Sequence, residues 1–337
     1  MDIKFEERNG WGLILLNRPQ VLNALTEEMC AVLDDKLVAW EQDSSIKAVL
    51  IEGAGDRAFC AGGDLKRFYG VEDAGIKARE FFATEYEMNQ VLFHFTKPYV
   101  SFLKGVAMGG GLGVSIHGSH RIGTETLMMA MPETGIGLYP DVGATYFLSR
   151  MPNSIGFYLG LTGNPVNAAQ AKACGLVTHF VLSEKLPALK ESLLNAPDDV
   201  DGVLSKFSPN IDVPFEEVDV ISRCFNQNSV EAILAALEKD GGEFALETKE
   251  ILLSRSPTSL KVTLRALQYG EQHDFDECMA MEYHLSAQFL KYHDFSEGIR
   301  AVLIEKDLMP KWKPANLIEV DDAMVDAFFK QSIDYDQ

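Results

Sequence analysis

Two carboxylates eight positions apart could share the acid and base work of one reaction. Glu133 lies in the sequence MPETG and Asp141 in the sequence YPDVG, with glycines and a proline in the loop between them. Such a loop lets both side chains face one pocket, where two carboxyl groups divide base or nucleophile work from acid work when their surroundings separate their pKa values. The structural alternatives are that Asp141 caps a helix and that Glu133 is a surface residue of the loop.

Two glycine-rich turns, each after an apolar strand pattern, could bind an oxyanion. One spans Phe59–Asp64 and contains Gly63, and the other spans Met108–Gly111 and contains Gly110. Glycine lets the backbone approach a ligand closely, and two converging backbone N–H groups would form an oxyanion hole, usually the largest contribution in acyl-group chemistry. The alternative is that the glycines only serve tight turns and close packing.

Other catalytic arrangements find no support in the sequence. Gly111 and Gly113 are followed by Ile116, so the GxGxxG pattern of dinucleotide-binding proteins is not met, and the GK[ST] of a P-loop is absent. The sequence GVSIH, which ends at His117, misses the G-x-S-x-G nucleophile elbow at its last position. Because neither an HExxH motif nor a Cys/His ligand set occurs, we expect no metal and no nicotinamide.

The composition fits one large globular domain with an appendage. The chain has 337 residues, of which 47% are hydrophobic and 24% are charged. No apolar run approaches the ~20 residues that span a bilayer, so we expect no integral membrane protein. The net charge of −20 disfavours nucleic acid and anionic membranes as partners, whereas an anionic small molecule needs only a local group of cations.

The cysteines and the start of the chain predict a cytoplasmic protein. The five cysteines are scattered and form no CxxC pair, so we expect reduced thiols rather than a disulfide framework or a zinc site. A strand-like pattern begins at once, over Asp2–Arg8, with no leader of the secretory or the Arg/Ser-rich kind. The cysteines are Cys30, Cys60, Cys174, Cys224 and Cys278.

The elements that must position these residues alternate between strands and helices up to about Val181. The turn Asn9-Gly10 separates two expected strands, and Thr26 is expected to cap a helix. From about Lys185 the pattern becomes helical, so we expect an α/β region followed by a helical C-terminal third. The expected strands are Ile3–Glu7, Gly12–Leu16, Ala48–Ile51, Tyr99–Leu103 and a pair around Ile122 and Leu127–Met129; the expected helices include one to about Trp40, one over Ala74–Phe95 and one that starts at Asp141.

Three motifs in this order resemble the crotonase (enoyl-CoA hydratase/isomerase) superfamily. They are Asn17–Leu25, Ala58–Leu65 and Gly105–Gly111. The segment Met131–Gly143 and four C-terminal segments resemble the branch of that superfamily that hydrolyses 3-hydroxyacyl-CoA thioesters, so the resemblance covers nearly the whole chain. The C-terminal segments are Ser256–Lys261, Met281–Tyr283, His293–Ala301 and Pro310–Pro314.

The resemblance implies an α/β fold of the crotonase type (ClpP/crotonase-like). A spiral core of ββα turns over residues 1–190 would carry the CoA-binding and oxyanion-hole loops. A helical region over residues 191–337 would cover the active site. Coenzyme A would be part of the substrate, and no separate cofactor is expected. The family commonly forms trimer-based assemblies, which leaves a homo-oligomer open for this chain.

The resemblance also assigns roles to individual residues. Gly63 and Gly110 match the two oxyanion-hole positions. Glu133 matches the main catalytic carboxylate, and Asp141 matches the second acid of the hydrolase branch. Glu85 matches a polar position that binds the substrate together with Gly110, Glu133 and Asp141. For Glu85 the structural alternative is an exposed glutamate on a helix.

One departure from the family pattern narrows the chemistry. Enoyl-CoA hydratases carry a glutamate two residues after the glycine triplet, but Gly113 stands there in this chain. The chain therefore lacks one of the two glutamates that hydration of a double bond uses. An isomerase with a single base also lacks this glutamate, so isomerase activity is excluded less firmly. A third alternative is an acyl-CoA-binding protein without activity, which would need neither Glu133 nor Asp141. Candidate cations for the CoA phosphates are Arg18, Lys66, Arg67, Lys97 and Lys104.

Overall fold

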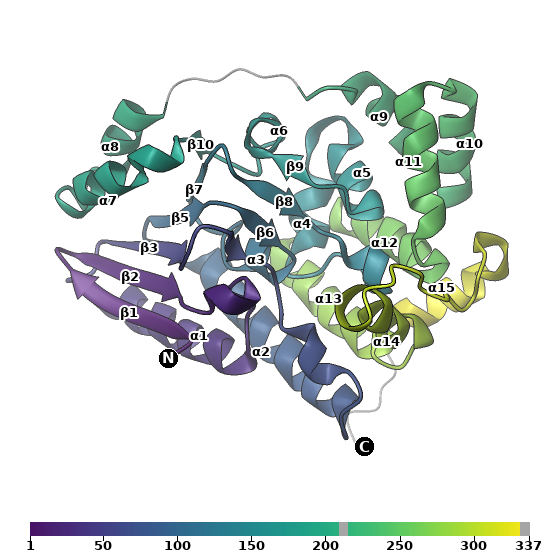
Figure 1. Ribbon diagram of the computed structural model, residues 1–337, viewed down its shortest axis with the longest axis horizontal. Helices are drawn as coiled ribbons and strands as arrows, with labels where there is room; N and C mark the ends of the chain where they lie inside the picture. Colours follow the sequence, from purple (N-terminus) through teal and green to yellow (C-terminus); the bar gives the residue numbers. More distant parts are fainter. Residues whose placement is uncertain (209–214, 331–337) are drawn as a thin grey trace. The chain divides into compact units, whose positions relative to one another are not determined.

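The computed structural model describes residues 1–208 and 215–330 (Figure 1). The chain forms two compact units that alternate along the sequence. Each unit consists of three separate segments of the chain, and one boundary between the units falls within helix α2 (Ala74–His94). None of the helices in the described residues is long and apolar enough to cross a membrane. The first unit comprises Met1–Asp64, Thr84–Met131 and Asn164–Glu216; the second comprises Leu65–Ala83, Pro132–Gly163 and Glu217–Gln337.

The first unit is built on two mixed sheets. The six-stranded sheet has the order β1-β2-β3-β5-β7-β10, with β1 and β2 antiparallel and all other pairs parallel. The four-stranded sheet has the order β4-β6-β8-β9. The strands are β1 (Ile3–Arg8), β2 (Trp11–Leu16), β3 (Ala48–Gly53), β4 (Ala58–Cys60), β5 (Tyr99–Leu103), β6 (Val106–Met108), β7 (His120–Gly123), β8 (Met128–Ala130), β9 (Val166–Asn167) and β10 (His179–Phe180).

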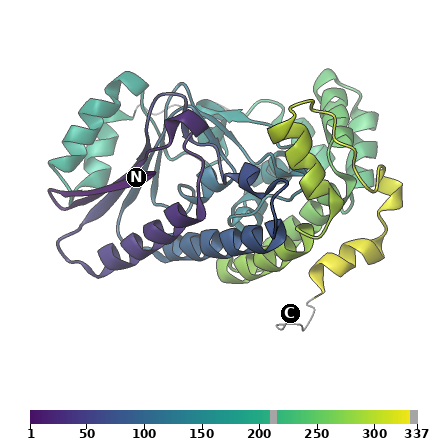
Figure 2. The ribbon, with the colours of Figure 1, turned by 60° about the horizontal axis from the view of Figure 1, so that its bottom comes forward.

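Helices α7 (Leu186–Leu194) and α8 (Val200–Phe207) cover one face of the six-stranded sheet and lie side by side in Figure 2. Their leucines pack on side chains from successive strands, among them Trp11 and Phe102. The indole N–H of Trp11 also donates a hydrogen bond of 2.9 Å to the carbonyl oxygen of Leu193. Burial of each such leucine is worth about 1.5–3 kcal/mol, which explains why these short helices are held on the sheet.

Helix α1 (Glu27–Gln42) begins where the sequence predicts it. The Thr26 side chain accepts a hydrogen bond from the backbone N–H of Met29, and Leu33, Leu37 and Trp40 are buried along one face. The cap satisfies a first-turn N–H, and the apolar residues recur at helical spacing. The first unit also contains the short helices α3 (Gly110–Gly113) and α6 (Ala168–Ala173).

In the described residues of the second unit, all regular secondary structure is helical. Helix α12 is its central element, because it packs on α4, α5, α10 and α15. The elements are the 3₁₀ turns η2 (Leu65–Phe68), η3 (Glu133–Ile136), η4 (Pro152–Ser154) and η7 (Leu317–Glu319); the helices α4 (Ala144–Ser149), α5 (Ile155–Thr162), α9 (Val218–Phe225), α10 (Val230–Asp240), α11 (Glu243–Ser254), α12 (Pro257–Gly270), α13 (Phe275–Phe289), α14 (His293–Gly298) and α15 (Asp322–Phe329); and the π-helical segment η6 (Ile299–Ile304).

The structure confirms the change from alternating strands and helices to helices alone, and it corrects two details. The strand around Ile122 and the strand around Met129 do not pair, because β7 belongs to the six-stranded sheet and β8 to the four-stranded sheet. The helix expected to start at Asp141 begins at Ala144, with Gly143 as its N-cap. The assignment of residues 1–190 to a core and 191–337 to a covering region stays a prediction.

Candidate active site

The two glycine-rich turns of the first unit lie against each other. A Cβ atom added at Gly62 would lie 3.0 Å from the carbonyl oxygen of Met108 and 3.4 Å from the amide nitrogen of Gly110. Gly62 has a φ of +98°, a conformation that L side chains rarely adopt. Both the backbone conformation and the close approach therefore require glycine at this position.

The amides of Gly63 and Gly110 are not used to hold these turns together. Gly63 bridges to Leu25 through its neighbours, since the N–H of Leu25 donates to Gly62 O (2.8 Å) and the N–H of Asp64 donates to Leu25 O (2.9 Å). Gly110 is the first residue of α3, so its N–H has no acceptor within the helix. Among the residues that the structure describes, neither amide donates a hydrogen bond, and both can serve a ligand.

Glu85, on the part of α2 that belongs to the first unit, packs directly on Gly110. Its side chain is buried, and a Cβ atom added at Gly110 would overlap Glu85 Oε1. Burial is the main cause that raises the pKa of the Cys30 thiol, and the negative charge of Glu85 raises it further. The alternative that Glu85 is an exposed helix residue is therefore wrong.

Glu133 begins the 3₁₀ turn η3 in the second unit and is buried, with 5% of its surface exposed. The next residue anchors the turn: the hydroxyl of Thr134 donates to Leu161 O (3.0 Å), and the N–H of Ser256 donates to Thr134 O (3.2 Å). The alternative of a solvated loop residue is therefore wrong for Glu133.

Helix α14 supports the same turn from another side. A Cβ atom added at Gly137 would overlap the carbonyl oxygen of Asp294, and one added at Gly298 would overlap that of Ile136. The buried Asp294 side chain accepts hydrogen bonds from the Ser256 hydroxyl and the Lys313 N–H, both at 2.7 Å. Burial raises the pKa of the Asp294 carboxyl, and these donors oppose the rise. The C-terminal helices thus fix the backbone that carries Glu133.

Asp141 is buried, with 4% exposed, in the loop that leads to α4. It lies two residues ahead of Gly143, the N-cap of α4, so the alternative that Asp141 is the N-cap residue is wrong. The following residue, Val142, has a φ of +54°. A β-branched residue in the left-handed region is strained and needs support from its surroundings.

That support comes from Glu282 on α13, which sequence reasoning did not identify as a functional residue. Its carboxylate accepts hydrogen bonds from Gly143 N (2.7 Å), Thr145 N (3.0 Å) and Thr145 Oγ1 (2.5 Å). Burial is the main cause that raises the pKa of the Glu282 carboxyl to about 8, and the negative charge of Asp141 raises it further. A signal was present in the sequence: Glu282 is a charged residue on a face of α13 that is otherwise mostly apolar.

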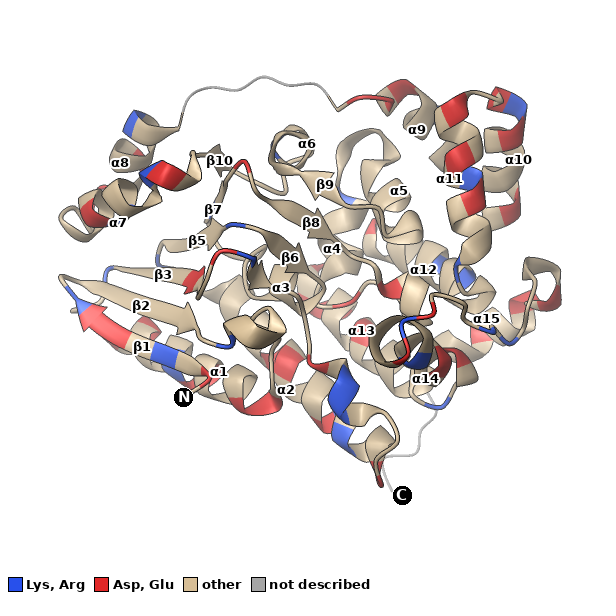
Figure 3. Ribbon diagram, viewed as in Figure 1, with Lys and Arg blue, Asp and Glu red and all other residues tan. Residues whose placement is uncertain are grey.

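Three of the five candidate cations for CoA phosphates have structural roles. Arg18 forms an ion pair with Asp64 at 3.0 Å, Lys97 donates to carbonyl oxygens at the end of α1, and Lys104 pairs with an aspartate. The other two lie exposed on η2, in a chain whose acidic residues are spread over both units (Figure 3). They are Lys66 and Arg67.

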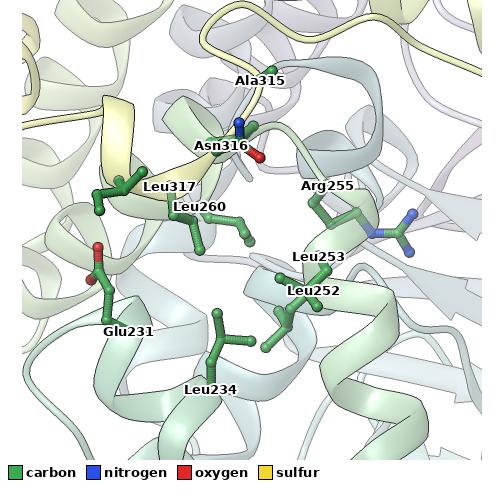
Figure 4. A pocket seen from close by; sticks show the side chains of 11 residues that line it. Glu231, Leu234, Leu252, Leu253, Arg255, Leu260, Ala315, Asn316 and Leu317 are labelled. Carbon is green, nitrogen blue, oxygen red and sulfur yellow. The ribbon is translucent and has the colours of Figure 1, made fainter.

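A pocket of about 430 Å³ in the second unit contains none of the predicted site residues (Figure 4). Leucines of α10, α11 and α12 line it together with the segment Ala315–Ile318. Arg255 lines it with its stem, while the guanidinium is turned away from the leucines and donates to Thr162 O (2.8 Å). Within the described ranges no group of three or more His, Cys, Asp or Glu side chains could hold a metal ion.

Comparison with known proteins places the chain in a family. The model of the Enoyl-CoA hydratase/isomerase family matches residues 11–329. The solved structures that resemble the chain include a carnitinyl-CoA dehydratase from Mycobacterium thermoresistibile (TM-score 0.93, 38% identity, 99% of this chain and 97% of the other). An enoyl-CoA hydratase from Rhodobacter sphaeroides 2.4.1 is also similar (TM-score 0.90, 35% identity, 98% and 97%). The chain therefore belongs to the enoyl-CoA hydratase/isomerase, or crotonase, family of acyl-CoA enzymes, and it has the α/β crotonase fold with a helical C-terminal region.

Within this family the chain is similar to the mitochondrial 3-hydroxyisobutyryl-CoA hydrolases. It is 44% identical to the Rattus norvegicus protein over 98% of this chain and 89% of the relative. It is 43% identical to the Homo sapiens protein over 98% and 88%. These relatives carry a hydrolase name, whereas the two solved structures carry dehydratase and hydratase names. The names alone therefore do not identify the reaction that this chain catalyses.

Proposed function

We propose that the protein hydrolyses a 3-hydroxyacyl-CoA thioester, namely 3-hydroxyisobutyryl-CoA to 3-hydroxyisobutyrate and CoA, as in valine catabolism. One observation carries the proposal. Asp141 is a buried carboxylate in the loop ahead of α4, while Gly113, buried in α3, stands where hydratases of the family carry a glutamate. The identity to 3-hydroxyisobutyryl-CoA hydrolases over nearly the whole chain supports the same reading.

The amides of Gly63 and Gly110 bind the thioester carbonyl oxygen in this proposal. Negative charge develops on that oxygen as the tetrahedral transition state forms, so the two donors bind the transition state more tightly than the substrate. Their freedom from other hydrogen bonds in the described residues is consistent with the role. Glu85 belongs to the substrate-binding set and fixes the position of Gly110 by packing on it.

Glu133 starts the bond-breaking step by one of two routes. It either takes a proton from water, whose oxygen then attacks the carbonyl carbon, or attacks the carbon itself and forms a mixed anhydride that water hydrolyses afterwards. In both routes the C–S bond breaks and the thiolate receives a proton. Single-turnover hydrolysis in H₂¹⁸O with excess enzyme probes the route: label in the Glu133 carboxylate requires the anhydride, whereas label only in the product acid favours direct attack by water.

Asp141 binds the 3-hydroxyl group of the substrate and helps to transfer a proton to the leaving thiolate. This role uses a carboxyl group that can both accept a hydrogen bond and exchange a proton. Neither step needs a metal ion or a redox cofactor. CoA enters as part of the substrate and leaves as a product.

An assay for free CoA tests the proposal against its alternatives. The protein is incubated with 3-hydroxyisobutyryl-CoA and a thiol reagent, and also with an enoyl-CoA. A hydrolase releases CoA from the first substrate, a hydratase or isomerase changes the second without releasing thiol, and an acyl-CoA-binding protein does neither. Turnover of the enoyl-CoA without thiol release from the hydroxyacyl-CoA would replace the hydrolase with a hydratase or isomerase.

A further inference from the structure

Glu282 is a fully buried carboxylate that the proposed mechanism does not use. It lies on α13 among Cys278, Met279 and Leu285, and its exposed fraction is 0%. Within the part of the chain that the structure describes, no lysine, arginine or histidine forms an ion pair with it. Burial of a polar group is costly unless it is hydrogen-bonded, so the hydrogen bonds of Glu282 must compensate.

Among the described residues, every hydrogen-bond donor to the Glu282 carboxyl oxygens comes from the segment that follows Asp141. These donors are the N–H of Gly143 and both the N–H and the hydroxyl of Thr145. On the other side of Asp141, the hydroxyl of Tyr139 donates to the backbone carbonyl of Glu282. Glu282 therefore contacts the chain on both sides of Asp141: its backbone carbonyl binds the Tyr139 side chain, and its carboxyl group binds Gly143 and Thr145.

The turn that follows Asp141 has an unfavourable backbone conformation. Val142 (φ +54°) and Gly143 (φ +85°) are consecutive left-handed residues, and the first of them is β-branched. The first N–H groups of α4 also need an acceptor from outside the helix. The Glu282 carboxyl oxygens supply that acceptor. Loss of the Glu282 carboxyl group removes the acceptor for the N–H of Gly143 and the acceptor for the N–H of Thr145 at once.

We propose that Glu282 is a positioning residue that acts through Asp141: it fixes the Asp141–Val142–Gly143 turn in which the Asp141 carboxyl group can meet the substrate hydroxyl and the leaving thiolate. The inference rests on the proposed function for its catalytic consequence. The fixed turn itself rests only on the contacts within the second unit.

Glu282→Gln is the direct test. Glutamine keeps the shape of the side chain, but its single oxygen cannot serve both Gly143 and Thr145, and its NH₂ group faces an N–H donor. We expect kcat to fall about 10- to 100-fold, as displacement of a catalytic group does, with a smaller change in KM. The matched control is Glu277→Gln, an exposed residue of the same helix whose oxygen accepts the N–H of Asp274, which glutamine also does. This control should keep wild-type turnover.

A double-mutant cycle separates positioning from a general loss of stability. If Glu282 acts through Asp141, Glu282→Gln lowers kcat less than about twofold when Asp141 is already alanine, which leaves no side chain to position. The proposal would be overturned if the fold-loss of kcat in the double variant equalled the product of the losses in the two single variants. Thr145→Val, which removes one of the three hydrogen bonds and keeps the side-chain shape, provides the same cycle if Glu282→Gln fails to fold.

Hydrogen exchange tests the fixed turn without any activity. In Glu282→Gln, the peptide that covers residues 139–145 should exchange at least about tenfold faster than in the wild type, while the peptide over α11 stays unchanged. Unchanged exchange at 139–145 would overturn the proposal. A wild type that releases no CoA but shows the faster exchange in the variant would refute the hydrolase function and leave the held turn intact.

Discussion

At the scale of single residues, three buried carboxylates carry the proposed chemistry, and each is held by different neighbours. Glu85 packs on Gly110, Glu133 lies on a turn anchored through Thr134, and Asp141 lies on a turn held by Glu282. A charged group in low-dielectric surroundings interacts more strongly with a substrate than one in water. Their burial is therefore an argument for function as well as a cost to stability.

Asp141→Asn should lower kcat less than a change at Glu133 does. Asparagine can still hydrogen-bond the substrate hydroxyl, so part of the contribution stays, and KM should rise as the orientation loosens. A capping role would have been preserved by asparagine, with kcat and KM near the wild-type values. Steady-state kinetics with 3-hydroxyisobutyryl-CoA measure the difference, and unchanged constants would remove Asp141 from the mechanism.

Gly110→Ala should cost activity because the new methyl group meets Glu85 Oε1 and comes within 3.3 Å of Leu25 Cδ1. The side chain or the turn must shift, and with it the amide that binds the carbonyl oxygen. Loss of one oxyanion donor typically lowers kcat about 10²–10³-fold. Gly75→Ala is the matched control, since nothing lies within 4 Å of a Cβ there. Equal activity of the two variants would refute the assignment of Gly110.

At the scale of elements, α13 and α14 hold the two turns that carry Glu133 and Asp141. Gly298 allows α14 to approach η3 closely, and Gly298→Ala would place a methyl group on the carbonyl oxygen of Ile136. We expect a loss of about 1–3 kcal/mol in the free energy of unfolding, as for other overpacked contacts, together with lower kcat. Thermal unfolding and kinetics check both. A destabilised variant with full kcat would show that this contact does not position Glu133.

The Glu282 carboxyl on α13 should make the second unit less stable as pH rises. Its pKa is raised from 4.5 to about 8 in the folded protein, mainly by burial. Between these values the folded state keeps a proton that the unfolded state has lost. The stabilisation is complete below pH 4.5 and is lost as pH rises through 8, with a slope of up to ~1.4 kcal/mol per pH unit. The difference in unfolding free energy between the wild type and Glu282→Gln should therefore fall from pH 5 to pH 8, and a constant difference would contradict the buried acid.

At the scale of the whole molecule, local patterns predicted most elements and most candidate residues. The Thr26 cap and the helical spacing of buried residues located α1, and the apolar run Tyr99–Leu103 is β5 as predicted. The motifs located Gly63, Gly110, Glu85, Glu133 and Asp141 in the sequence. Their catalytic roles stay a proposal.

Local sequence patterns could not predict the contacts between segments that are far apart in the chain. Glu282 lies more than 130 positions from Gly143 and Thr145, so nothing in its local sequence indicates which backbone groups it binds. Strands as short as β7 and β8 carry no signal of the sheet to which they belong. The alternation of the two units along the chain likewise follows from packing between segments that are far apart in sequence.

The measurement that tests the central claim most directly is the rate of CoA release from 3-hydroxyisobutyryl-CoA by the wild type and by Glu133→Gln. An amide has nearly the shape of the acid but neither its basicity nor its nucleophilicity, so substrate binding should survive while turnover is lost. We predict that the wild type releases CoA and that kcat of the variant falls by about 10²–10⁴-fold, or further if the route is covalent. CoA release by Glu133→Gln at the wild-type rate would contradict the account.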